Sequence, residues 1–326
     1  MKKIITILFL VTAIIAKSQI QVGSADFPQG NRSGKLSPEN IGKLKSLFTT
    51  IFILQTGDSL RKAEFENAIS QVWTVNKFKV ILPHEQIQYA NRTDCAFGHF
   101  DAFLDYSNNT LSRIIMNYKL EFPIFSKNGK IKEWNMISSL NLFPDNEYRD
   151  RLLYEKKTGK VNIFLGSGTI SSEELSKLMY SSVYFKNWSP GFLKGYFKKM
   201  NDVLESGNTF RSYYDDNKLN FLNHKNLIQL KGDTLYLPEY IKDDCKDFEL
   251  KNLPFTVSFI SQIKLDSMIL NRIEKFYYLS CIINSSEKYI NVFEGASGNM
   301  IYTKYSTMEY KFKKYDLKKI AEAIDK

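Results

Sequence analysis

The stretch TTIFILQTGDSLRKAEFENAISQVWTVNKFKVIL, residues 49–82, decides the fold class of this chain. Residues 49–55 are rich in β-branched and aromatic side chains, which predicts a strand that ends before Gly57-Asp58. Residues 77–82 predict a second strand, and Pro83 ends it. The intervening residues 59–73 carry an apolar stripe at helical spacing, formed by Phe65, Ala68, Ile69, Val72 and Trp73. A strand–helix–strand order favours a parallel pair of strands with a right-handed crossover.

The chain then continues with a pair of strands and a mostly helical middle. Residues 97–105 and 113–125 predict an antiparallel pair joined at Ser107-Asn108-Asn109, whereas residues 131–143 fit neither pattern clearly. The middle of the chain predicts helices at 147–155, at 175–186 and, begun by Ser189-Pro190, at 191–205.

The C-terminal third returns to the pattern of the N-terminal third. Strands are predicted at 233–241, 254–260, 276–284, 288–293 and 299–305. Ser261 is expected to cap a helix whose apolar side includes Leu265, Met268, Ile269 and Ile273, and Asp316 is expected to cap the last helix. Since strands 49–55, 77–82 and 97–105 find counterparts at 233–241, 254–260 and 276–284, we expect a duplicated α/β module. Coincidence among common strand-forming residues is the alternative.

These patterns predict an α+β protein with mixed sheets, packed helices and five segments. Residues 1–18 are expected to be a signal peptide and 19–36, which are polar with Gly and Pro, a flexible lead-in. A first α/β module is expected over 37–145, with its first helix begun by Ser37-Pro38, then a helical middle segment over 146–230 and a second module over 231–326.

The first eighteen residues follow the pattern of a secretory signal. Lys2 and Lys3 precede an apolar run from Ile4 to Ile15, and Ala16-Lys17-Ser18 places small residues where a signal peptidase cleaves. A helix of this run would span only about 18 Å, too short for the ~30 Å hydrocarbon core of a membrane. We therefore expect a periplasmic or secreted protein that is cleaved after Ser18 and carries no transmembrane segment in its mature form.

Charge and cysteine content narrow the classes of partner. The chain has 45 Lys and Arg against 35 Asp and Glu, a formal charge of +10. An exported basic protein could meet anionic lipid or polysaccharide, or another envelope protein, and nucleic acid is a less expected partner. The favoured interpretation is a solvated, mildly cationic surface, because the charges are interspersed. Three cysteines allow at most one bridge, for which Cys95–Cys245 is the favoured pair, since Cys281 lies in an apolar run.

The segment VNIFLGSGTISSEELSKL, residues 161–178, has the layout of a phosphate-binding turn but not its chemistry. A dinucleotide fingerprint needs a glycine where Ser171 stands, and a P-loop needs a lysine that is missing before Lys177. Ser171 and Glu174 instead fit a capping box, which places acidic charge at the helix start. We expect a structural joint with no bound cofactor.

Two other groups of residues are candidates for chemistry. His84-Glu85 begins a zinc-protease pattern, but Gln88 replaces the second histidine. Cys95, His99 and Asp101 lie close in sequence, yet members of a catalytic triad normally come from separate elements. The sequence therefore predicts no catalytic, cofactor-binding or metal-binding residue.

The C-terminal hairpin carries a weak family resemblance. Val292-Phe293 through Gly298 to Tyr302 resembles the ending of PepSY-like secreted modules. Together with the signal and the TT-x-F-x-L strand at residues 49–54, it is similar to uncharacterised exported proteins of Gram-negative envelopes, which have no assigned activity.

Three functions are compatible with these observations. The expected one is a non-catalytic binding or accessory protein of the cell envelope. The alternatives are a hydrolase acting on envelope material and a membrane-surface protein that uses its basic C-terminal helix, where Lys311, Lys313, Lys314, Lys318 and Lys319 cluster.

Overall fold

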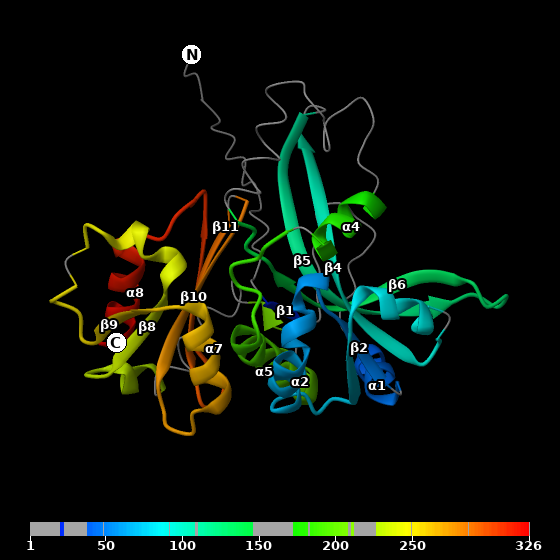
Figure 1. Ribbon diagram of the computed structural model, residues 1–326, viewed down its shortest axis with the longest axis horizontal. Helices are drawn as coiled ribbons and strands as arrows, with labels where there is room; N and C mark the ends of the chain where they lie inside the picture. Colours follow the sequence, from blue (N-terminus) through cyan, green and yellow to red (C-terminus); the bar gives the residue numbers. More distant parts are fainter. Residues whose placement is uncertain are drawn as a thin grey trace, which may run out of the picture.

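Two β-sheets with helices between and beside them make up the computed structural model, which confirms the α+β class (Figure 1). The structure describes residues 20–22, 38–47, 49–90, 92–107, 110–145, 172–181, 183–207, 210–211, 226–248, 250–285 and 287–325. The predicted signal peptide, the Ser37 cap, the helix at 147–155 and the Gly166–Gly168 turn lie outside these residues.

The first sheet has seven strands in the order β3-β2-β4-β5-β6-β1-β7. Its β2 runs parallel to both β3 and β4, and β4, β5 and β6 form an antiparallel meander. The strands are β1 (Ile20–Val22), β2 (Thr49–Ile53), β3 (Lys77–Ile81), β4 (Cys95–Ser107), β5 (Thr110–Phe125), β6 (Ile131–Asn141) and β7 (Phe210–Arg211). The ambiguous stretch 131–143 is thus mostly strand.

The second sheet has five strands in the order β12-β11-β10-β8-β9. Here β8 runs parallel to β9 and β10, and β10, β11 and β12 form an antiparallel meander. The strands are β8 (Thr234–Pro238), β9 (Thr256–Ile260), β10 (Tyr277–Asn284), β11 (Glu287–Glu294) and β12 (Met300–Thr307).

The two sheets share one topology. The order β3-β2-β4-β5-β6 corresponds, strand by strand and direction by direction, to β9-β8-β10-β11-β12. The three strand pairs matched in the sequence occupy equivalent places in this order. This agreement supports the proposal that one module was duplicated.

Helices fill the space between the sheets and cover the outer face of the second sheet. In Figure 1, α2, α5 and α7 lie between the sheets, and α8 lies on the far side of the second sheet. The α-helices are α1 (Pro38–Ser46), α2 (Lys62–Ser70), α4 (Ser172–Ser181), α5 (Pro190–Ser206), α7 (Gln262–Asn271) and α8 (Lys314–Ile324). Short 3-10 helices are η1 (Thr56–Arg61), η2 (Pro83–Tyr89), η3 (Ile228–Leu230), η4 (Glu239–Ile241) and η5 (Asp243–Cys245).

Helix α5 joins the two sheets into one core. Ser189 caps it as expected, with its Oγ accepting a hydrogen bond from the Phe192 amide, and Pro190 opens its first turn. One side of the helix places Phe197 against Phe52 of the first sheet, and another places Tyr196 within 2.6 Å of Ser280 of the second. The middle segment is therefore part of the core in its described residues.

A buried polar contact also links the two sheets directly. The side chain of Asn284 on β10 accepts a hydrogen bond from the Met116 amide of β5 and donates to the Met116 carbonyl. It also donates to Asn141 of β6 at 2.7 Å. Because Asn284 is fully buried, these bonds fix the position of one sheet against the other.

Three expectations about local structure are wrong. Residues 20–22, expected within a flexible lead-in, form β1, where Ile20 and Val22 are buried, because a three-residue strand is too short to show periodicity. Lys313, not Asp316, is the N-cap of α8, since Asp316 reaches back from the third helical position to the Lys313 amide. Ile273 lies beyond the end of α7 and is exposed.

Two predicted segments have different bounds. The helix expected over 175–186 ends at Ser181, and Phe185 instead pairs with Pro144 in a β-bridge. The strand expected over 233–241 ends at Pro238 and continues as the 3-10 helix η4.

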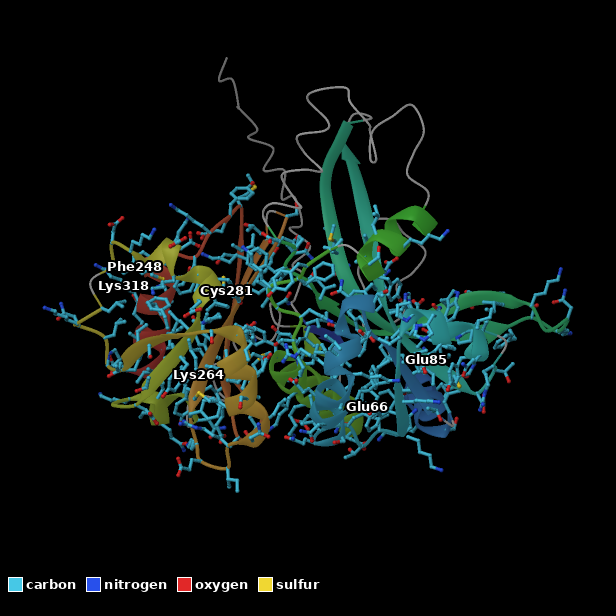
Figure 2. The ribbon with its side chains drawn as sticks, in the orientation of Figure 1. Glu66, Glu85, Phe248, Lys264, Cys281 and Lys318 are labelled. Atoms are coloured by element: carbon cyan, nitrogen blue, oxygen red, sulfur yellow. The ribbon has the colours of Figure 1, made fainter. Side chains whose placement is uncertain are left out.

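The favoured disulfide is also wrong, because all three cysteines are free. Cys95 packs with Ile51 and Phe97 on the first sheet, whereas Cys245 belongs to the core under the second sheet. Cys281 lies in that same core, as expected (Figure 2). Separate hydrophobic cores hold Cys95 and Cys245 apart.

Thiol titration should reflect this arrangement. Burial raises the pKa of Cys245 to about 12 and raises those of Cys95 and Cys281 as well, which disfavours the reactive thiolates. Ellman's reagent is expected to react slowly with the native protein and to count three thiols in urea without reductant. A count of one in urea would mean that a bridge forms.

Candidate functional site

A cavity of about 350 Å³ lies where elements of both halves of the chain meet. We name it the Asp58 pocket. Its walls come from η1 and α2 of the first half, from the end of α4 and the start of α5, and from the start of α7. The lining residues are Gln55, Gly57, Asp58, Arg61, Phe65, Tyr180, Ser181, Val183, Tyr184, Phe185, Trp188, Ser189 and Gln262.

The pocket lies beyond the carboxyl ends of parallel strands. Gln55 follows β2 after one residue, and Gln262 follows β9 after one residue. In open sheets with parallel strands, ligands bind preferentially outside the carboxyl ends. The strand–helix–strand unit at residues 49–82 therefore forms part of the first sheet and also one wall of this cavity.

Aromatic side chains form much of the wall. Trp188 packs against Phe65 with ring centroids 5.8 Å apart, and Phe65 and Phe185 are almost fully buried. Tyr184 is largely exposed at the rim. A volume near the lower end of the ~300–1,000 Å³ of ligand sites, with walls that combine aromatic and polar side chains, suits a small molecule.

Asp58 is the carboxylate of this pocket. Its Oδ2 accepts hydrogen bonds from the Trp188 indole nitrogen at 2.8 Å and from the backbone amide of Gln55 at 3.0 Å. Burial raises the pKa of Asp58, while the hydrogen bonds from Trp188 and from the Gln55 backbone, together with the charge of Arg61, act against that rise. Among the described residues, no cationic side chain forms an ion pair with Asp58.

Behind the pocket, Asp266 of α7 organises the polar groups. Its Oδ1 accepts from Ser189 Oγ at 2.7 Å, from the Gly191 amide at 3.2 Å and from Gln262 Nε2 at 2.9 Å. Its Oδ2 accepts from Arg61 at 2.8 Å. Burial raises the pKa of Asp266 despite these four donors. Asp266 thus holds η1, α5 and α7 together without lining the cavity.

Gln262 has an unused acceptor. Its Nε2 donates to Ser189 Oγ and to the Asp266 carboxylate, which can only accept and therefore fixes the orientation of the amide. Its Oε1 is buried and has no hydrogen-bond partner in the described part of the chain. Buried polar atoms are nearly always bonded, so this acceptor needs a donor from elsewhere.

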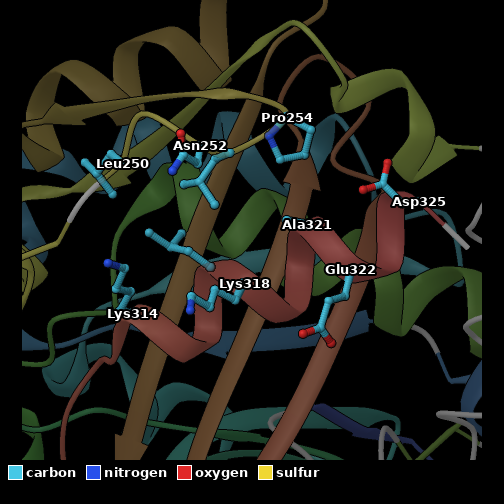
Figure 3. A pocket seen from close by; sticks show the side chains of 10 residues that line it. Leu250, Asn252, Pro254, Lys314, Lys318, Ala321, Glu322 and Asp325 are labelled. Carbon is cyan, nitrogen blue, oxygen red and sulfur yellow. The ribbon is translucent and has the colours of Figure 1, made fainter.

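A second cavity of about 420 Å³ is an open groove between α8 and residues 250–254 (Figure 3). Lys314 and Lys318 lie toward one end of α8, and Glu322 and Asp325 lie toward the other. Asp325 pairs with Lys231 at the surface. The groove carries both signs of charge, and none of its lining side chains has a buried polar atom without a hydrogen-bond partner. The Asp58 pocket is therefore the stronger candidate.

The candidate residues from the sequence do not assemble into one site. His84 and Glu85 lie on η2, where Glu85 caps the turn at Leu82 and pairs with Lys62. His99 lies 2.8 Å from Glu121 on the neighbouring strand, and Asp101 pairs with Lys119. Cys95 is four residues before His99 on β4, roughly 13 Å along an extended strand, too far for a nucleophile–base pair.

Sequence reasoning did not single out the pocket residues. The sequence pattern marks Gly57-Asp58 only as the end of a strand, and it gives no signal at Trp188 or Gln262. The available signal was the position of an acidic residue after the carboxyl end of a strand that begins a parallel unit.

Comparisons with known proteins give no relative from which a site could be transferred. No protein-family model, no curated protein and no solved structure matches the chain. Within the described residues, no helix is long and apolar enough to cross a membrane, and no three or more His, Cys, Asp or Glu are grouped to hold a metal ion.

Proposed function

We propose that this chain is an exported, non-catalytic binding protein of the cell envelope that holds a small ligand in the Asp58 pocket. The observation that carries the proposal is the pocket itself, a cavity with aromatic walls in which the partly buried Asp58 carboxylate forms no ion pair within the described residues. Such a group is stable in water-poor surroundings when a bound molecule satisfies it.

Blocking the pocket should abolish ligand binding without unfolding the protein. Gly57 is exposed at the pocket and a Cβ there meets no atom within 4 Å, so Gly57→Trp adds an indole at the mouth without strain. Probes that share a phenyl ring and a two-carbon spacer are 2-phenylethylamine, 2-phenylethanol and 3-phenylpropanoate. Saturation-transfer NMR is expected to detect binding of at least one probe to the unmodified protein, and Gly57→Trp is expected to reduce it at least tenfold.

Gly42→Trp is the matched control, because Gly42 on α1 is also exposed with open space around its Cβ. It should bind the probes as the unmodified protein does. Equal binding by Gly57→Trp, or no binding of any probe to the unmodified protein, would contradict a ligand site in this pocket.

Export has a separate test. Expressed with residues 1–18 in a Gram-negative host, the protein is expected in the periplasmic or secreted fraction with Gln19 as its N-terminus. N-terminal sequencing of the purified protein checks the cleavage site. Recovery from the cytoplasm with Met1 or Lys2 at the N-terminus would contradict the proposal.

A hydrolase is the second candidate, and the raised pKa of Asp58 is the observation that favours it. A partly buried carboxyl with a raised pKa can act as a general acid. Hydrolysis with two carboxyl groups also needs a second one facing the substrate. The neighbouring carboxylate, Asp266, already accepts four hydrogen bonds behind the pocket wall, so we favour binding.

The membrane-surface alternative has weaker support. Lys313 pairs with Glu309 at 3.1 Å, and Lys319 pairs with Glu322 at 2.6 Å. Lys318 remains exposed on α8 (Figure 2). These pairs reduce the positive charge that the helix presents to an anionic surface.

A further inference from the structure

We propose that the ligand of the Asp58 pocket is a small organic cation, a primary ammonium joined to an apolar body. This inference rests on the proposed function and names the class of ligand that the pocket takes. Three features carry it: the unpaired carboxylate, the use of every amide and indole N–H donor of the lining side chains, and the aromatic walls.

The first feature is the charge on Asp58. Its two hydrogen-bond donors, the Trp188 indole and the backbone amide of Gln55, are neutral groups. Asp58 is partly buried, and a carboxylate withdrawn from water without an ion-pair partner is costly. A cation placed beside it recovers part of that cost. A ligand ammonium next to Asp58 would supply the missing counter-ion.

Arg61, whose charge acts against the rise in the pKa of Asp58, forms its ion pairs with other carboxylates. Arg61 forms ion pairs with Asp266 at 2.8 Å and with Glu64 at 2.7 Å, and these bonds outweigh its partial burial and raise its pKa. With Asp58, one guanidinium faces three carboxylates in this region. The local charge is therefore negative although the whole chain is basic, and an anionic ligand is disfavoured.

The second feature is the balance of donors and acceptors. Gln55 Nε2 donates to the carbonyls of Met179 and Val183, which uses both of its hydrogens. The Trp188 indole and Gln262 Nε2 are likewise fully used. Asp58 Oδ1 has no hydrogen-bond partner among the described residues and can still accept. Gln262 Oε1 also has no partner there, but it is fully buried.

This balance selects a ligand that donates. An ammonium group has three donors and no acceptor, so it can donate to Asp58 Oδ1 without bringing a lone pair that needs a donor. A carboxylate or phosphate would bring further acceptors to a site whose amide and indole donors are occupied and whose net charge is negative. The amide orientation of Gln262 is fixed by Asp266, so this side chain cannot rotate to offer a donor instead.

The third feature is the aromatic wall. Trp188, Tyr184 and Phe65 all line the cavity. Aromatic faces attract cations within about 6 Å of the ring centroid, and they cover the apolar body of the ligand. The cavity of about 350 Å³ limits that body to a small one.

The three matched probes test the ligand class on the unmodified protein. At pH 7, 2-phenylethylamine is a cation, 2-phenylethanol is neutral and 3-phenylpropanoate is an anion, while the rest of each molecule is similar. Isothermal titration calorimetry is expected to show at least tenfold tighter binding of the amine than of the alcohol, and no measurable binding of the acid.

Asp58→Asn should remove this preference. The asparagine oxygen can still accept from Trp188 and Gln55, but the negative charge is lost, so amine affinity is expected to fall at least tenfold while alcohol affinity changes little. Asp243→Asn is the control, because that carboxylate is 87% exposed on the surface.

The outcomes separate the two proposals. Tightest binding of the alcohol or the acid, lost in Gly57→Trp, would overturn the cation and leave the binding function standing. Binding of no probe would overturn both. Since the comparison of probes uses the unmodified protein, it decides the ligand class even if Asp58→Asn fails to fold.

Discussion

Replacing Asp266 with alanine is expected to lower the free energy of unfolding by about 3–5 kcal/mol. The carboxylate is almost fully buried and accepts from Ser189, Gly191, Gln262 and Arg61. Its removal leaves Arg61 without its buried partner and several donors unsatisfied, at a cost of roughly 1–3 kcal/mol for each buried group. Urea denaturation followed by circular dichroism measures the change.

Asp243→Ala provides the control, because Asp243 makes only an exposed ion pair with Lys246. Exposed pairs contribute about 0–1 kcal/mol, so this variant should unfold near the midpoint of the unmodified protein. A loss below about 1 kcal/mol for Asp266→Ala would show that the hydrogen-bonded group around Asp266 does not hold η1, α5 and α7 together.

The second large effect is expected at the contact between the two sheets. Asn284→Leu keeps the branched shape of the side chain but removes the partner of the Met116 backbone amide and of Asn141. We expect the free energy of unfolding to fall by about 2–4 kcal/mol, because buried polar groups are left unpaired. Near-ultraviolet circular dichroism and urea denaturation report the packing and the stability.

The matched variant is Asn271→Leu at the end of α7, where the asparagine is exposed and makes one long hydrogen bond of 3.5 Å to Ser267. Its effect should stay within about 0.5 kcal/mol. If the two variants lose equal stability, the polar contact at Asn284 contributes nothing specific to the joining of the sheets.

Periodicity and turn residues predicted the fold well where they act locally. The alternation of apolar residues located β2, β3 and β4 and their counterparts β8, β9 and β10, and Ser189-Pro190 located the start of α5. These signals succeed because strand pairing and helix capping depend on residues near in sequence. Even the shared topology was accessible from the recurring order of elements.

Long-range contacts set the parts that the sequence did not predict. The Asp58 pocket needs η1, α5 and α7 to meet, and the meeting depends on hydrogen bonds between residues as distant as Arg61 and Asp266. No pattern near Asp58 in the sequence predicts that Trp188 is its hydrogen-bond partner. The cysteine pairing failed for the same reason, since only the packed structure assigns Cys95 and Cys245 to separate cores.

The short strand β1 has a consequence for the order in which the chain folds. Strands β2 to β6 come from one continuous stretch, residues 49–141, whereas β1 starts at Ile20 and pairs with both β6 and β7. Its place between them is complete only when Arg211 is available. Such distant pairings form slowly because a long loop must close first. During synthesis from the N-terminus, one of the earliest segments made is therefore expected to be among the last to dock.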